Sequence, residues 1–175
     1  MSKVWRISAT CALGLFLALA PFSGCGGDGG VEKEEAELAE FAVREILVPR
    51  EGERNFVAVW TRKSEGAGDV SVEALAQRIW KWEGGILSEI GLEEYRRLVG
   101  THQGERNTWT YGEHSVTVME YDPGKGEAVV EIGSLYGPMT GAGIRYFLRR
   151  EGGKWKKVSE QTVWMSRARE EECGS

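Results

Sequence analysis

The sequence predicts an α+β domain, in which N-terminal helices pack on a curved antiparallel sheet of about four to six strands. Apolar residues first repeat at helical spacing, and from residue 109 onward they alternate with a period of two. Helices that precede a run of strands are typical of this class. The chain has 175 residues, of which 41% are hydrophobic and seven are tryptophans, enough for one packed core.

Charge is distributed unevenly along the chain. Residues 1–24 contain no acidic residue, and their charges are Lys3 and Arg6. Without them, 20 of the 22 basic residues and all 27 acidic residues remain, a net charge of −7. A net acidic domain repels phosphate backbones and anionic headgroups, so the sequence argues against nucleic acid as a partner.

The first 24 residues have the three parts of a secretory signal peptide. Lys3 and Arg6 form the positive start, residues 9–20 form an apolar run, and Ser23-Gly24 precede Cys25. The apolar run is shorter than the roughly 20 residues that a helix needs to cross a bilayer. The segment is therefore interpreted as a removable leader and not as a membrane span.

The residues Phe22-Ser23-Gly24-Cys25 resemble the lipobox of bacterial lipoproteins, although Phe22 stands where leucine is usual. The resemblance implies cleavage between Gly24 and Cys25 and a diacylglycerol group, with acyl chains such as palmitate, on the Cys25 thiol. Two acyl chains hold a protein firmly on a membrane of the cell envelope. Gly26 in place of aspartate indicates the outer membrane, facing the periplasm, if the host is Gram-negative.

After the leader, the chain is predicted to form one domain between two short segments. Residues 25–30, the lipidated cysteine and a glycine-rich stretch, form a tether. Residues 31–166 form the domain, and residues 167–175 form a charged tail. Once Cys25 carries lipid, Cys173 has no partner cysteine in the mature chain, so the domain is expected to fold without an internal disulfide.

Helices and strands are assigned within residues 31–166 from their hydrophobic periods and turn signals. The expected helices cover residues 31–48 (ending before Pro49), 71–82 (capped by Ser71) and 92–99 (with Tyr95 and Leu98 inward). The expected strands cover residues 55–61, 115–121, the region of Val130, Ile132 and Tyr136, and the region of Ile144 to Leu148. Residues 155–158 and 161–165 supply the last strand or a pair of strands. Turns are expected at Asp122–Lys125 and Glu151–Lys154.

The C-terminal part, residues 128–166, resembles the end of small uncharacterised envelope proteins of bacteria. The residues that carry the resemblance are Tyr136-Gly137, Tyr146-Phe147, Gly153-Lys154-Trp155 and Trp164-Met165-Ser166. The Gly-Lys-Trp ending is also similar to the last hairpin of NTF2-like and cystatin-like sheets. The resemblance implies a curved sheet, and it implies no activity.

No residue is predicted to be catalytic or to bind a metal or cofactor. His114 follows Glu113, but adjacent strand residues point to opposite faces, so Glu113 cannot orient His114 for acid–base work. His102 lies in a polar segment, and two histidines without further ligands make a poor metal site. A surface or structural role is favoured for His114.

Four glycines, Gly133, Gly137, Gly141 and Gly143, invite comparison with a phosphate-binding loop. No Gly-Lys-Ser/Thr sequence follows them, so a bent connection between strands is the favoured interpretation.

Trp82 is the candidate contact residue. If residues 71–82 form a helix, Trp80 and Trp82 diverge by about 200°, so only one of them faces the core.

The favoured hypothesis is a non-enzymatic, lipid-anchored module that binds an unknown protein, glycan or small molecule in the envelope. One alternative is a small NTF2-like pocket enzyme, a hydrolase or isomerase. Another alternative is an inhibitor or immunity lipoprotein. A deep pocket with buried polar residues would favour the enzyme, whereas a sheet with an exposed aromatic patch would favour binding.

Overall fold

The computed structural model describes residues 29–62, 75–100, 110–137 and 140–166. The leader, Cys25 with the following residues up to Asp28, Ser71, His102, Trp109 and Cys173 lie outside the described residues. Predictions that concern those positions are neither supported nor contradicted by the fold.

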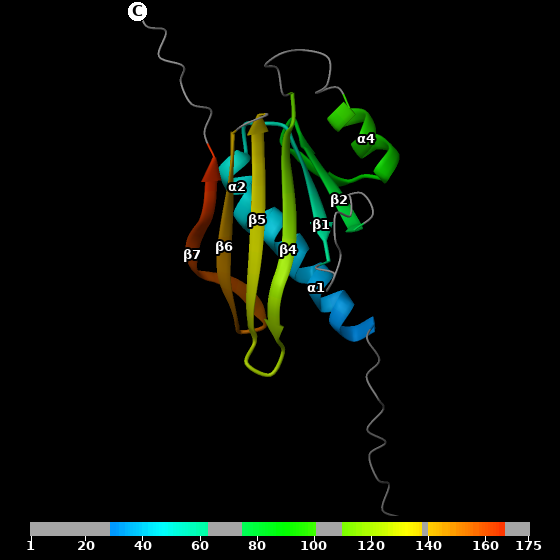
Figure 1. The fold of residues 1–175 in the computed structure, drawn as a ribbon. Coiled ribbons are helices and arrows are strands. Elements are labelled where there is room, and N and C mark those ends of the chain that lie inside the picture. Colours follow the sequence, from blue (N-terminus) through cyan, green and yellow to red (C-terminus); the bar gives the residue numbers. More distant parts are fainter. Residues whose placement is uncertain (1–28, 63–74, 101–109, 138–139, 167–175) are drawn as a thin grey trace, which may run out of the picture.

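One seven-stranded sheet dominates the domain (Figure 1). Its strand order is β3-β2-β1-β4-β5-β6-β7. The bounds are β1 Phe56–Thr61, β2 Ala76–Glu83, β3 Ile86–Glu89, β4 Gly112–Asp122, β5 Glu127–Gly137, β6 Thr140–Glu151 and β7 Lys154–Ser166. Neighbouring strands are antiparallel except β1 and β4, which are parallel at the centre of the sheet.

The prediction of an α+β domain with four to six strands is wrong. Strands account for 57% of the described residues, so the domain is mostly β. The clearest error concerns residues 71–82, because their described part, from Ala76, belongs to strand β2. Ile79 and Trp80 lie on opposite faces of the sheet, yet both are buried. Burial on both faces hides the period of two and leaves a helix-like pattern.

The helical segment is longer than predicted and passes through Pro49. It comprises α1 Gly29–Phe41, the π-helical segment η1 Ala42–Leu47 and α2 Val48–Glu51. The Val48 amide bonds to the Val43 carbonyl, five residues back. Because proline lacks an N–H and clashes with the preceding turn, a wider turn just before Pro49 lets the helical path continue. Within the described residues, no helix has the length and hydropathy to cross a membrane.

The helical segment packs on one face of the sheet, which we call the inner face. Its apolar side chains, including Leu38, Ala42 and Val43, meet Phe56 and Trp80 in the main core cluster. The opposite, outer face carries a second cluster, in which the predicted helix α4 Leu92–Gly100 covers strands β1 and β2. Tyr95 and Leu98 of α4 face inward, as predicted.

The second half of the sheet follows the sequence prediction closely. Ile144, Tyr146 and Leu148 lie on the inner face, opposite Arg145 and Arg149. The Glu151–Lys154 hairpin places Gly152 and Gly153 at φ angles of 58° and 79°. Positive φ at both turn positions is the geometry that favours glycine in a two-residue hairpin. The short strand β3 was not predicted, because four residues carry too little periodicity.

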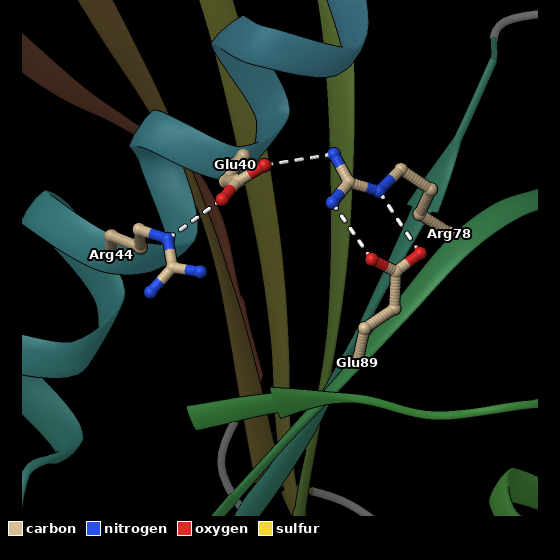
Figure 2. A network of polar contacts seen from close by, with 4 residues as sticks. All are labelled: Glu40, Arg44, Arg78 and Glu89. Atoms are coloured by element: carbon tan, nitrogen blue, oxygen red, sulfur yellow. Dashed lines mark hydrogen bonds and ion pairs between the residues drawn. The ribbon is translucent and has the colours of Figure 1, made fainter. Parts of the chain in front are cut away.

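An ion-pair network joins the helical segment to the β2–β3 side of the sheet (Figure 2). The Arg78 guanidinium donates to Glu40 of α1 at 2.9 Å and to both carboxylate oxygens of Glu89, at 3.1 and 2.8 Å. Arg44 bonds to the other oxygen of Glu40 at 2.8 Å. Hydrogen bonding to Arg44, opposed by burial and aided by Arg78, lowers the pKa of Glu40. The network therefore ties three elements together through Arg78.

Replacing Arg78 tests this linkage. We expect Arg78→Met to lower the free energy of unfolding by about 1–2 kcal/mol, because a partly buried, bidentate pair is lost. The matched control is Arg97→Met, since Arg97 is 68% exposed and lies 3.8 Å from its carboxylate partner. Urea unfolding measures both variants, and equal stabilities for the two would contradict the role given to Arg78.

Candidate functional site

The outer face of strands β4 to β7 is not covered by α4, and we call it the open face. Its residues lie in cross-strand rows that the strand register defines. One row contains Ser115, Gly133, Gly143 and Trp164. The next contains Thr117, Glu131, Arg145 and Gln161, which we call the polar row. The open face is therefore the broadest surface of the described sheet on which side chains of several strands meet solvent.

Trp164 lies flat on this face. A Cβ atom added to Gly143 would overlap the indole atoms Nε1, Cδ1 and Cε2. Cβ atoms added to Gly141 and Gly133 would lie 3.2 Å and 3.7 Å from the far side of the same ring. One ring face thus rests on three glycines of two strands, and 40% of the residue remains exposed. The exposed surface is consequently the other face of the indole ring.

The surroundings of Trp164 are polar and electrically balanced. Arg145 and Glu131 of the polar row pair at 2.8 Å, and Arg149 and Glu127 pair at 3.0 Å further along the same strands. Beyond the polar row, Phe147 and Val158 are exposed. They line a groove of about 520 Å³ together with Val129. The open face therefore offers two apolar surfaces with a charge-neutral, hydrogen-bonding row between them.

Strand β7 forms one edge of the sheet and is exposed along almost its whole length. Its pairing with β6 is interrupted by register shifts at Val158 and Val163. Bulges and edge lysines such as Lys154 and Lys156 prevent another strand from adding to a sheet edge. The open face, and not the β7 edge, is therefore the surface suited to recognition.

His114 lies on the inner face, and Glu113 lies on the outer face, as the alternation predicted. Glu113 accepts a hydrogen bond from the Tyr95 hydroxyl at 2.7 Å. His114 is 1% exposed and packs edge-on against Phe56 and Tyr136. Its Nδ1 lies 2.8 Å from Ser134 Oγ. Burial lowers the pKa of His114 to about 4, so the imidazole is neutral at pH 7.

Hydrogen bonds link His114 to Ser134 and Tyr136 to Glu51. The Tyr136 hydroxyl donates to a carboxylate oxygen of Glu51 at 3.1 Å, and a carboxylate can only accept. Burial, the larger effect, raises the pKa of Tyr136, while Ser134, which lies close to Tyr136, lowers it. Ser134 Oγ and Nδ1 of His114 share one hydrogen bond, whose donor depends on the imidazole tautomer. We call these four residues the His114 chain.

The second ring nitrogen of His114, Nε2, is buried and has no hydrogen-bond partner in the described part of the chain. A buried polar group without a partner costs about 1–3 kcal/mol. The His114 chain therefore lowers the stability of the fold while it holds Tyr136 and Glu51 in place at the end of the sheet.

Trp82, the predicted contact residue, lies on a strand of the sheet and not on a helix. Trp82 is half-buried, stacks on Phe56 at 6.3 Å and donates its indole N–H to the Gly52 carbonyl at 3.1 Å. Trp80 and Trp82 share the inner face because β2 is a strand, so the helical argument for an exposed Trp82 fails and its contact role stays a prediction. Among the described residues, no group of three His, Cys, Asp or Glu side chains has the arrangement to hold a metal ion.

Trp164 and its glycines were not recognised from the sequence. The glycines were interpreted as a bent connection, but Gly133, Gly141 and Gly143 lie within β5 and β6. The signal was nevertheless present, because the spacing of two between Gly141 and Gly143 puts both on one face of a strand. What the sequence does not contain is the register that places Trp164 opposite Gly143. The phosphate-loop reading has no support, since Gly133, Gly141 and Gly143 accommodate an aromatic ring.

Burial of His114 predicts a pH dependence of stability. The unfolded histidine has a pKa near 6.5, above the folded value of about 4, so the unfolded state binds the proton more readily. The free energy of unfolding should fall by about 2 kcal/mol between pH 6.5 and 4.5. His114→Gln should remove this slope in urea unfolding. NMR of the imidazole nitrogens should show a neutral His114 ring at pH 6.5, and an imidazolium signal at that pH would contradict the lowered pKa.

Comparisons with known proteins add no further guide to this site. No protein-family model matches the chain, and no curated protein or solved structure matches it either. The function therefore has to be argued from the geometry of the open face and of the His114 chain.

Proposed function

We propose that this chain is a lipid-anchored, non-enzymatic binding module of the cell envelope and that its open face binds a neutral glycan. The observation that carries the proposal is Trp164, whose ring lies on the glycines of β5 and β6 with its other face exposed. An aromatic side chain held flat in water offers a large, rigid contact area at little entropic cost. Sugar rings present apolar C–H faces that fit such a surface.

The charges of the open face favour a neutral, hydroxyl-rich ligand over a charged one. Two acidic and two basic side chains of the open face neutralise each other in the pairs Glu131–Arg145 and Glu127–Arg149. Such pairs attract neither a basic nor an acidic peptide. They supply donors and acceptors, together with Thr117 and Gln161, for the hydroxyl groups of a sugar.

The lipid anchor gives the module an orientation. Helix α1 begins at the same end of the sheet as the β4–β5 hairpin (Figure 1), and Glu34 of α1 accepts a hydrogen bond from Tyr121 near that hairpin. From Cys25 to Gly29 the chain spans at most about 14 Å. With lipid on Cys25, the hairpin end faces the membrane and the open face stands beside it, within reach of envelope polymers.

The pocket-enzyme alternative is less well supported. Its best residue is His114, but Nε2 of His114 is buried and has no hydrogen-bond partner among the described residues. A general base has to come within hydrogen-bond reach of its substrate. The inhibitor or immunity alternative requires a protein partner, and the binding experiment below distinguishes it.

The glycan proposal predicts that Trp164 dominates binding. Isothermal titration calorimetry should detect binding of the N-acetylglucosamine hexamer to the mature domain. Trp164→Ala should weaken this binding about tenfold or more, and Trp164→Phe should retain part of it. The matched control is Ile86→Ala, since Ile86 is 70% exposed on the opposite edge strand β3.

Two results would overturn the glycan proposal. One is the absence of binding to this hexamer, to cellohexaose and to purified peptidoglycan. The other is equal affinity of Trp164→Ala and wild type, with unchanged circular dichroism to verify folding. Capture of a protein with no sugar binding would support the inhibitor alternative instead.

The anchor is tested separately. Mass spectrometry of the protein from its native membrane should show that residues 1–24 are absent and that Cys25 carries diacylglycerol. Cys25→Ser should prevent palmitate labelling and move the protein out of the membrane fraction, whereas Cys173→Ser should change neither. Retention of residues 1–24, or an unmodified Cys25 thiol, would contradict the anchor.

A further inference from the structure

A polar cleft lies at the end of the sheet where α2 meets the start of β4 and the end of β5. It has a volume of about 300 Å³ and is lined by Glu51, Arg54, Asn55, Thr110, Gly112 and Tyr136. A wider hollow adjoins it and shares Glu51, Arg54 and Tyr136. This volume falls within the range of small-molecule sites. The cleft is separate from the open face, so nothing argued for the glycan depends on it.

Two opposite charges line the cleft without neutralising each other. Glu51 and Arg54 are three residues apart, and the Arg54 amide bonds to the Glu51 carbonyl. Their side chains nevertheless form no ion pair, and the Arg54 guanidinium has no ion-pair partner among the described residues. By contrast, the neighbouring Arg50 is paired with Glu160 at 2.5 Å. A carboxylate and a guanidinium are thus both available to a ligand in one small cleft.

The His114 chain holds the acidic half of this pair. Tyr136 donates to Oε1 of Glu51, which leaves Oε2 free to accept from a ligand. Gly112 lines the cleft directly above His114, since a Cβ added there would lie 3.4 Å from Nε2. The buried imidazole, whose Nε2 has no partner among the described residues, therefore lies beneath the cleft; it supports the cleft wall through its hydrogen bond to Ser134 and its edge-on contact with Tyr136.

We propose that this cleft binds a small zwitterion, a molecule with one carboxylate and one ammonium group, such as a free amino acid. Arg54 binds the carboxylate through two parallel N–H···O bonds, the geometry that guanidinium groups favour. Glu51 accepts from the ammonium group. Asn55 and Thr110 supply polar contacts around the remainder of the ligand. Ser134 is a positioning residue, because it acts on the ligand through Tyr136 and Glu51.

The test uses the mature domain and a defined set of probes. The common L-amino acids are screened by calorimetry, and the best binder is compared with its amide, which lacks the carboxylate, and its N-acetyl form, which lacks the ammonium group. Each blocked form should bind about tenfold more weakly. The free dipeptide of the same residue distinguishes a free amino acid from a peptide end as the source.

Charge variants should separate the two halves of the site. Arg54→Gln should weaken binding of the zwitterion about tenfold but leave binding of the amide form unchanged. Glu51→Gln should weaken binding of the zwitterion about tenfold but leave binding of the N-acetyl form unchanged. Arg97→Gln, which removes an exposed guanidinium on α4, outside both sites, is the matched control. Ser134→Ala should weaken binding severalfold and shift the NMR signal of the His114 Nδ1.

The proposal is overturned if no amino acid binds, or if both blocked forms bind as well as the parent. It is also overturned if Arg54→Gln and Glu51→Gln, verified as folded by circular dichroism, bind as wild type does.

Discussion

The organisation of this domain depends on the unequal cover of its two sheet faces. The helical segment Gly29–Glu51 packs along the inner face and buries side chains from β1 through β6. On the outer face, helix α4 has nine residues, packs on the β1–β2 side and reaches only the start of β4, through the Tyr95–Glu113 hydrogen bond. A seven-stranded sheet is too broad for so short a helix, so among the described residues no helix covers the outer face of the rest of β4 and of β5 to β7. The open face and the polar cleft both lie where this helical cover of the sheet ends.

The open face shows how a protein stabilises an uncovered sheet surface. Three glycines would leave β5 and β6 without side-chain cover, which weakens a sheet. Trp164 supplies that cover from the neighbouring strand, and its own ring is thereby fixed parallel to the sheet. One contact thus serves both stability and recognition. The paired charges nearby keep the surface soluble without giving it a net sign.

In the His114 chain, a buried group that lowers the stability of the fold holds other side chains in position. A neutral imidazole without a partner for Nε2 is an expensive residue in a core. A well-packed apolar residue in its place would cost nothing in unsatisfied hydrogen bonds. What His114 supplies is a hydrogen bond to Ser134 and an edge-on contact with Tyr136, the residue that donates to Glu51. The wall of the cleft therefore depends on a residue of the core, His114.

The sequence predicted the parts of the fold in which only one face is buried, and also β1, whose short β-branched run is buried on both faces. It placed α4, the β4–β7 hairpins and the opposite orientation of Glu113 and His114, because these depend on local period and turn chemistry. It failed for β2, where burial of Ile79 and Trp80 on both faces hides the alternation. Neither site was predicted, because Trp164 on Gly143 and His114 beside Ser134 depend on strand register. Register is set by tertiary packing and is not visible in a single strand.

The central claim, that the outer face of β4 to β7 is open and presents Trp164, is tested most directly by hydroxyl-radical footprinting of the folded protein. Mass spectrometry then reports the oxidation rate of each tryptophan. The account predicts rapid oxidation of Trp164 and strong protection of Trp60 and Trp80, which are 2% and 1% exposed. Protection of Trp164 equal to that of Trp80 would mean that another part of the molecule covers this face, and it would contradict the account.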